Sequence, residues 1–149
     1  MKQENQIQVR LISVSEVKFM LNLDEALLAK SQPDGPNIGF AHVVSANKEN
    51  STITLIFGVQ YAVDNTPLLE SRYAFTFNVS HIDDVVKIEN NKIEIKGLMP
   101  HFVSVAIGTM RGIIVAKTAG TPLAKYPLPM LDAQSVLENM VANMQTEQK

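Results

Sequence analysis

The stretch ITLIFGVQYAV, from Ile53 to Val63, decides the fold class of this chain. Its apolar residues fall on every second position, which is the period of a strand with one buried face. Asp64-Asn65-Thr66-Pro67 then supplies turn-forming residues, and the returning stretch from Tyr73 to Val79 repeats the alternation. The two stretches predict an antiparallel hairpin with one apolar, aromatic-rich face.

Two alternating stretches precede this hairpin. Apolar residues alternate from Ile38 to Val44, and Asn47 to Asn50 supplies the next turn, so this stretch extends the hairpin to a meander. Apolar odd positions also alternate from Ile7 to Leu23, but Ser13 and Ser15 interrupt them. We therefore predict a bulge in this first strand, with Ile12 and Val14 turned inward.

The connection between the first two strands contains Asp24 to Lys30, a predicted helical turn, and then Ser31 to Pro36. Two prolines and a glycine in the second segment disfavour regular structure and predict a crossover loop. Further along, His81 to Lys96 is less regular and fits either a small hairpin or a linker with a helical turn.

Helices are predicted in the C-terminal third. Pro100 suits the first turn of a helix that is apolar on nearly every side and ends near residue 118. A proline-rich extended connection follows, and Asp132 is a good N-cap for a final amphipathic helix over residues 132–145. The sequence thus predicts one α+β domain over residues 1–149, with a four-stranded antiparallel meander between about residues 7 and 96.

Composition excludes several classes of protein. Of the 149 residues, 46% are hydrophobic and 19% are charged, which argues against disorder, and a net charge of −2 argues against nucleic-acid binding. Cysteine is absent, which removes disulfides and thiol chemistry. The N-terminal residues are polar, and the apolar run from Phe102 to Ala116 is interrupted and short for a bilayer. We expect a cytoplasmic protein without stable membrane insertion.

Residues that could carry chemistry are scattered. His42, His81 and His101 lie in different predicted elements and lack metal-ligand spacing. No serine has nucleophile-elbow context, and the glycines lack nucleotide-loop spacing. The sequence therefore predicts no catalytic residue, no metal site, no cofactor and no enzymatic activity.

The long predicted helix carries a less apolar stripe at helical spacing, formed by Ser104, Gly108, Arg111 and Val115. Small residues allow another backbone to approach closely, so we interpret this stripe as an oligomer interface. Arg111 requires a partner within this apolar segment. A salt bridge or a helix-pair contact is the simpler interpretation, and a ligand-anion site is the alternative.

Two groups of apolar residues have two interpretations each. Phe57, Tyr61, Phe75 and Phe77 are ordinary core residues by default, or else a site for apolar side chains of another chain. The C-terminal methionines Met130, Met140 and Met144 fit either an adaptable binding surface or the core.

The C-terminal run Gly120-Thr121-Pro122, Leu128-Pro129-Met130, Leu131-Asp132-Ala133 and Val136-Leu137, together with the order of elements, resembles the SecB export chaperone family. The stretch Gly108-Thr109-Met110-Arg111-Gly112-Ile113 is similar to SecB-like proteins. The resemblance covers most of the chain, although the chain lacks the family's strongly acidic character.

The resemblance implies an ATP-independent holdase that binds unfolded polypeptides. It further implies a dimer with a continuous sheet, pairing into a tetramer through the long helices, and a translocation ATPase as a partner. A groove between the crossover loop and the terminal helix would then hold the client. The residues expected to bind clients are Leu27, Leu28, Phe40, Tyr61, Tyr126, Met130, Leu137, Met140 and Met144.

Two other functions remain open at this stage. One is a dedicated chaperone for a single partner, such as an antitoxin. The other is a small-molecule-binding domain, since a curved aromatic sheet covered by a helix can enclose a pocket.

Overall fold

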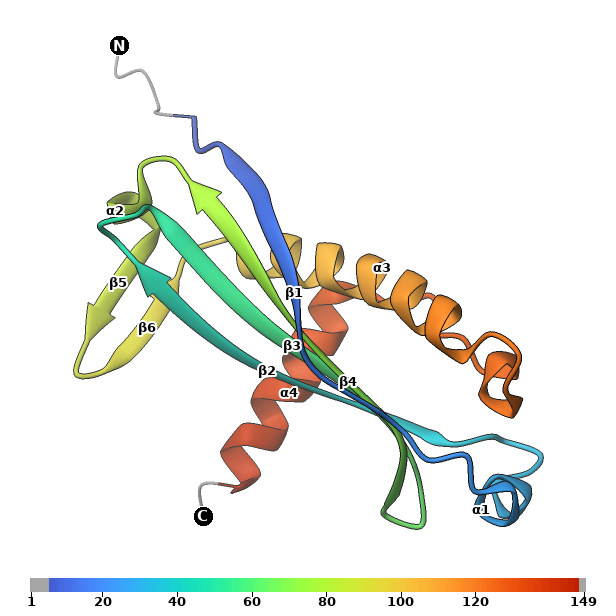
Figure 1. Ribbon diagram of the computed structural model, residues 1–149. Helices are drawn as coiled ribbons and strands as arrows, with labels where there is room; N and C mark the ends of the chain where they lie inside the picture. The colour runs from blue at the N-terminus through green and yellow to red at the C-terminus, as the bar shows by residue number, and fades with distance from the viewer. Residues whose placement is uncertain (1–5, 148–149) are drawn as a thin grey trace.

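The computed structural model describes residues 6–147, with side chains up to Met140 in the last helix. Four antiparallel strands form one sheet in the spatial order β1-β4-β3-β2 (Figure 1). The strands are β1 (Val9–Leu21), β2 (Asn37–Asn47), β3 (Thr52–Val63) and β4 (Thr66–Val79). Three strands form the expected meander, and the crossover containing α1 (Glu25–Lys30) sends the chain from β1 to the opposite edge. The predicted fold class is confirmed.

Tight turns follow the asparagine-rich segments. Asp64 and Asn65 both have positive φ, at 50° and 64°, as a two-residue turn between twisted strands requires. Asn90 and Asn91 adopt the same conformation, at 52° and 62°, between β5 (Val86–Glu89) and β6 (Lys92–Ile95). The helical turn α2 (Ile82–Val85) precedes this hairpin, so the segment contains both of the alternatives that its sequence suggested.

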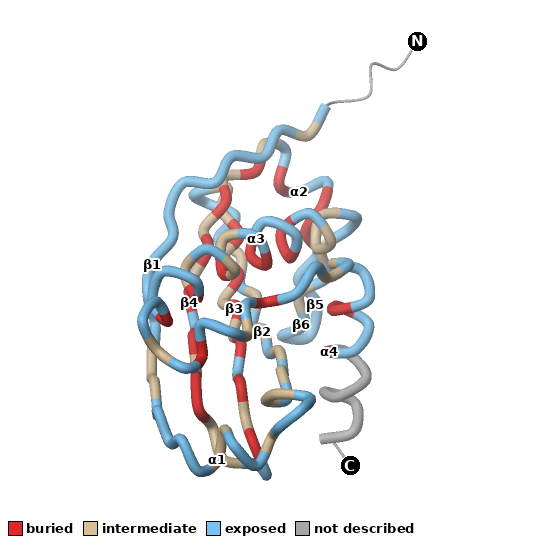
Figure 2. The backbone as a smooth tube through the Cα atoms, turned by 90° about the vertical axis from the view of Figure 1, so that its right-hand side faces the viewer, coloured by how far each residue is buried: buried red, intermediate tan, exposed pale blue. Residues whose placement is uncertain are grey.

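The core lies between one face of the sheet and the helices α3 (Met99–Thr118) and α4 (Ala133–Glu147). We call this side of the sheet the core face and the other side the open face. The rings of Phe77 and Phe102 stack with centroids 4.2 Å apart, and the Ser71 hydroxyl donates to the Met110 sulfur at 3.1 Å. Figure 2 shows the buried residues concentrated in β3, β4 and α3, while β1 is exposed. The default interpretation of Phe57, Tyr61, Phe75 and Phe77 as core residues is confirmed.

The predicted helix caps are present. The Asp24 carboxylate accepts from the backbone N–H of Leu27 at 3.1 Å, and the Asp132 carboxylate accepts from that of Ser135 at 3.1 Å. Pro100 lies in the first turn of α3. Asp24 and Asp132 each satisfy an amide that a helix start leaves free.

Strand β1 contains two register shifts rather than one. The first falls at Ile12, between Leu11 and Ser13, and the second at Val17. Val14 pairs with Phe75 and so shares the core face, but Ile12 is the extra residue of the first bulge and is 45% exposed. The expected inward turn of Ile12 is therefore wrong, because a bulged residue leaves the alternation of its strand.

Helix α3 covers the range predicted for it, which ended near residue 118, and extends beyond the apolar run from Phe102 to Ala116 at both ends. The helix has 20 residues and contains an 18-residue window with a mean hydropathy of 1.4, so it is long and apolar enough to cross a membrane by length and composition alone. The central helix of a globular core passes the same test, and α3 packs Phe102, Ala106, Met110 and Ile114 against the sheet. These contacts fit a core helix.

Candidate functional site

Helix α1 and the crossover loop, residues 31–36, lie against the connection that follows α3. Leu27 and Leu28 are half-buried and pack against the core. The slot between Leu28 and Leu123 of the 3-10 helix η1 (Pro122–Lys125) has a cavity volume of only about 10 Å³. A space of that size holds about one water molecule. The slot therefore does not admit a client side chain.

Tyr126 joins three parts of the chain. Its hydroxyl accepts from the Gln32 amide, and its backbone carbonyl accepts from the Tyr61 hydroxyl at 2.7 Å. Its ring covers Gly35, which has a φ of +81° and where an added Cβ would lie 2.6 Å from the ring. The crossover loop, β3 and the proline-rich connection are thus held together at this residue.

Burial separates the other predicted client-binding residues. Tyr61 is fully buried, and burial raises its pKa to about 12. Leu137 and Met140 are 9% and 3% exposed and face the core, whereas Met130 is 90% exposed. Phe40 is half-buried on β2, with its ring centroid 5.9 Å from that of Phe57.

Met144 lies outside the residues whose side chains the structure describes. The remaining predicted client-binding residues do not form one open groove. The chain's own Leu123, Tyr126 and Leu128 fill the space expected between the crossover loop and the terminal helix. Amphipathic spacing shows that one face of α4 is apolar, but it does not show whether that face meets the core or a client.

Helix α4 packs on the core face of β2. The Nδ1 of His42 lies 3.3 Å from the sulfur of Met140, and because a thioether only accepts, this contact favours the Nδ1–H tautomer. Burial lowers the pKa of His42. A neutral imidazole under α4 is therefore the form that suits this packing.

The outer face of α3 is exposed and largely uncharged. Ser104, Gly108 and Val115 of the predicted interface lie on it, and a Cβ added at Gly108 or Gly112 would meet nothing within 4 Å. Another helix could approach this face closely. The structure itself contains a single chain, so the interface stays a prediction.

Arg111 is used within its own chain. Its Nε donates to the Leu128 carbonyl at 2.9 Å and its NH2 nitrogen donates to the Pro129 carbonyl at 2.8 Å. The partner is neither a carboxylate nor a second helix, and the guanidinium fixes the proline-rich connection onto α3. Sequence spacing could not show this, because the partners are backbone carbonyls.

The open face contains two shallow hollows beside β2. One, of about 240 Å³, is lined by residues that include Gly39, Ala41, Gly58 and Arg72, and the other, of about 190 Å³, adds Val43. Neither is enclosed. The hollows form because glycine and alanine have small side chains that leave space on the surface of the sheet. The sequence did not predict these hollows.

The described residues contain no group of three His, Cys, Asp or Glu side chains that could hold a metal ion. Tyr73 is a third titratable residue, after Tyr61 and His42, whose pKa is shifted. Burial, followed by the adjacent Glu16 carboxylate, raises the pKa of Tyr73, whose hydroxyl donates to Glu16 at 2.9 Å. This pair joins β1 to β4.

No family model matches the chain, and no curated protein matches its sequence. Among solved structures, the Mycobacterium tuberculosis SecB-like chaperone Rv1957, in complex with a ChAD peptide from the Rv1956 HigA1 antitoxin, is similar with a TM-score of 0.50 and 9% identity. The match covers 83% of this chain and 88% of that one. A protein of unknown function from Streptococcus agalactiae is similar with a TM-score of 0.40 and 5% identity, over 85% of this chain and 98% of that one. The four-stranded antiparallel sheet with its two packed helices is the SecB-like fold.

Proposed function

We propose that this protein is an ATP-independent holdase that binds unfolded or extended polypeptides in the cytoplasm. The observation that carries the proposal is the SecB-like fold, together with the peptide bound to the neighbour of that fold. Apolar side chains left exposed on β1, β2 and α3 support it, among them Leu11, Val43 and Val115. Covering such a surface with the apolar side chains of an unfolded chain removes apolar area from water, which favours binding.

The proposal includes self-association through the outer face of α3. Ser104, Gly108 and Val115 leave that face flat and uncharged, as close helix packing requires. Replacing Gly108 by Glu places a charge at the centre of this face, at a position where an added Cβ meets nothing within 4 Å. Light scattering should show a dimer or tetramer for the natural protein and a smaller species for Gly108→Glu. A natural protein that is monomeric would contradict this part of the proposal.

Suppression of aggregation tests the holdase activity. The full chain, in several-fold molar excess over a chemically unfolded client such as reduced lysozyme, should suppress light scattering equally with and without ATP. Bovine serum albumin at the same mass concentration is the control for crowding. Scattering that equals the albumin control would overturn the proposal.

A dedicated chaperone for one partner is a second candidate, because the neighbour of the same fold was solved with an antitoxin peptide. This alternative predicts one stoichiometric complex in a pull-down from the native cell, whereas a general holdase predicts many clients. Delivery of clients to a translocation ATPase during export would be a role of a general holdase. Recovery of that ATPase, together with unfolded precursors, would support the export role.

A further inference from the structure

The open face of the sheet carries more cations than anions. The buried residues of β4 between positions 69 and 79 are odd-numbered, so its even-numbered residues face the open side. Arg10 and Lys18 of β1 pair with even-numbered residues of β4 and therefore share that side. The four strands direct three cations to this face, Arg10, Lys18 and Arg72, and one anion, Glu70. The face is cationic, although the whole chain has a net charge of −2.

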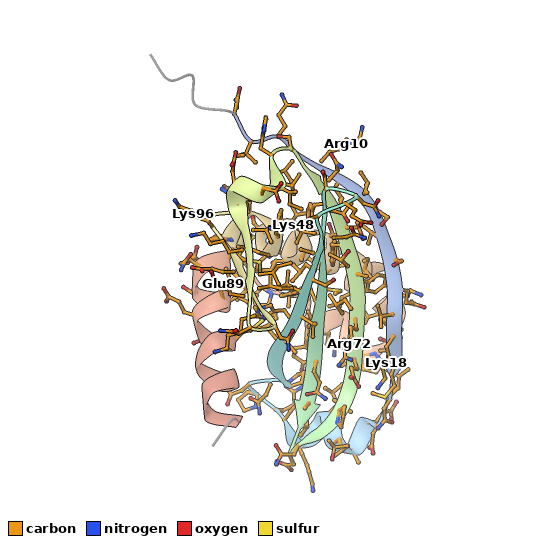
Figure 3. All side chains as sticks on the ribbon, turned by 90° about the vertical axis from the view of Figure 1, so that its left-hand side faces the viewer. Arg10, Lys18, Lys48, Arg72, Glu89 and Lys96 are labelled. Carbon is orange, nitrogen blue, oxygen red and sulfur yellow. The ribbon has the colours of Figure 1, made fainter. Side chains whose placement is uncertain are left out.

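Glu70 is shared between two of these cations. Its Oε2 lies 3.0 Å from the Nζ of Lys18, and its Oε1 lies 3.5 Å from the NH2 nitrogen of Arg72. Figure 3 shows the sheet from this side, with Lys18 and Arg72 on neighbouring strands and α3 behind them. The side chains of Lys18 and Arg72 are 51% and 44% exposed. Because one carboxylate balances only one of the two positive charges, this cluster can accept a carboxylate from a ligand.

Arg72 lies between the two hollows of the open face. A Cβ added at Gly58 would lie 3.6 Å from the Arg72 Nε and 3.7 Å from the Ala41 carbonyl oxygen, so the arginine side chain extends over β3 toward β2. Ala41, Gly58 and Arg72 also form one cross-strand row. These three residues line both hollows. The larger hollow adds Gly39 and Gln60, and the smaller one adds Val17, Val43 and Ile56.

The hollows have the spacing of side chains on one side of an extended peptide. Gly39 borders one hollow and Val43 borders the other, with the shared Ala41 midway between them on β2. Four residues of extended chain span about 13 Å, and positions i, i+2 and i+4 point to the same side. A peptide lying along β2 would therefore place two apolar side chains in the hollows and the intervening side chain at Arg72.

Size and chemistry favour a peptide over other ligands. The hollows, of about 240 and 190 Å³, are smaller than the about 300–1,000 Å³ that is typical of small-molecule pockets. Nucleic acid requires a row of cations along its phosphates, whereas Val17 and Val43 flank the arginine here and are 51% and 64% exposed. A second copy of this chain would bring the same cationic face, so charge repulsion disfavours face-to-face pairing.

We propose that the open face is a docking site for a short acidic segment of another protein, bound in an extended conformation over β2 and β3. The segment has the form apolar–x–acid–x–apolar. Its carboxylate contacts the guanidinium of Arg72, supported by the ammonium of Lys18, and its two apolar side chains fill the hollows. The inference goes beyond the proposed function, because this partner is recognised by its charge and spacing, whereas an unfolded client is recognised by apolar content alone.

An NMR titration of the full chain tests the site. The probe is a seven-residue peptide with blocked ends, glutamate at its centre, leucine two positions away on either side, and serine elsewhere. Saturable shift changes are expected at the amides of Gly39, Ala41 and Gly58, with an affinity that falls by about fivefold when salt rises to about 0.5 M. Shift changes confined to other elements would overturn the inference.

Two companion peptides test the recognition of charge. Glutamine or lysine replaces the central glutamate, and each peptide should bind about fivefold or more weakly than the parent. Equal affinity of the three peptides would refute the inference. A single-stranded oligonucleotide that binds at the same amides more tightly than the parent peptide would also refute it.

Neighbouring residues of β4 provide variants with opposite expected effects. Arg72→Gln removes the cation and should weaken binding of the parent peptide by about fivefold, whereas Glu70→Gln removes the competing carboxylate and should tighten binding by about threefold. Lys125→Gln removes an exposed cation from η1 and should bind as the natural protein does. Unchanged binding by Arg72→Gln, or weaker binding by Glu70→Gln, would refute the inference.

Filling a hollow tests the apolar contacts. A Cβ added at Gly39 meets nothing within 4 Å, so Gly39→Leu occupies the larger hollow and should weaken binding by about fivefold. Ser45→Leu places the same side chain on the same strand outside both hollows and should leave binding unchanged. Equal binding by the two variants would refute the inference. Loss of aggregation suppression with intact binding of the acidic peptide would remove the proposed function and support this site.

Discussion

The two edges of the sheet share one core but differ in how they are protected. Strand β1 has two bulges and three charged residues, and it is exposed along most of its length. Strand β2 is regular and uncharged, with its core-face side chains half-buried beside α4. A protein that needs no strand partner gains from protecting both edges. The two edges therefore differ in what protects them: β1 carries charges and bulges, whereas α4 and the β5–β6 hairpin lie beside β2 on the side away from β3.

The largest expected effect distinguishes two sets of backbone groups on β2. Those of the odd residues bond to β3, and those of the even residues point away from it, as follows from the hydrogen bond between Val79 and Ser51 and from the strand registers. Ala41→Pro removes an N–H that bonds to β3 and should lower the free energy of unfolding by about 3 kcal/mol or more. Ala46→Pro removes an N–H that points outward, so it should cost less than half as much. Urea unfolding of the two alanine variants measures the difference. Equal destabilisation would show that the assignment of inward and outward groups is wrong.

At the other edge, Glu16 is the residue that fixes β1 to the helix side of the sheet. Its carboxylate accepts from the Tyr73 hydroxyl at 2.9 Å and lies 3.5 Å from the Lys117 ammonium. Glu16→Ala leaves the hydroxyl of Tyr73, a residue that is 7% exposed, without this acceptor and should lower the free energy of unfolding by about 1–2 kcal/mol. Lys117→Ala should cost less, because that ion pair is solvent-exposed. A larger loss for Lys117→Ala would contradict the hydrogen bond as the main contribution.

Acid should weaken the packing of α4 on β2. Because burial lowers the pKa of His42, the unfolded chain binds a proton at higher pH than the folded chain does. The stability that neutral His42 contributes is present above pH 6.5 and is lost as the pH falls through 6.5 and below. The midpoint temperature of thermal unfolding should therefore fall less steeply between pH 8 and pH 5 for His42→Gln than for the natural protein. Identical slopes in the two proteins would exclude His42 as the group responsible.

The smallest effect is expected from the ion pair on the open face beside β1. Lys18 lies 3.0 Å from the Glu70 carboxylate, and its side chain is 51% exposed. Exposed pairs contribute about 0–1 kcal/mol and are screened by salt. Lys18→Ala should change the free energy of unfolding by less than about 0.5 kcal/mol at 0.5 M salt. A loss above 1 kcal/mol would show that this edge depends on its charges for stability.

Sequence patterns predicted well those elements that depend on interactions between residues close in the sequence. The alternation in β3 and β4, the turn at Asp64 and Asn65, and the caps at Asp24 and Asp132 each depend on neighbours within a few residues. The second bulge in β1 was not predicted. It depends on the register against β4, a strand that is distant in the sequence.

The candidate site was harder to predict than the fold. Arg111 was identified from helical spacing and Tyr126 from the family resemblance, but their partners are the backbone carbonyls of Leu128 and Pro129 and the Gln32 side chain, respectively. These contacts come from tertiary packing, which periodicity does not encode. The sequence shows that β2 is uncharged, but only the strand order shows that β2 lies at an edge of the sheet.

The strand order also sets the sequence of events at the ribosome. β1 is synthesised first, but its neighbour in the sheet is β4. Glu16 therefore cannot form its hydrogen bond until Tyr73, which is 57 residues further along the chain, has been synthesised. Contacts between distant residues form late, and unpaired strands are prone to aggregate meanwhile. The bulges and charges of β1 would keep this nascent segment soluble until the meander has emerged to receive it.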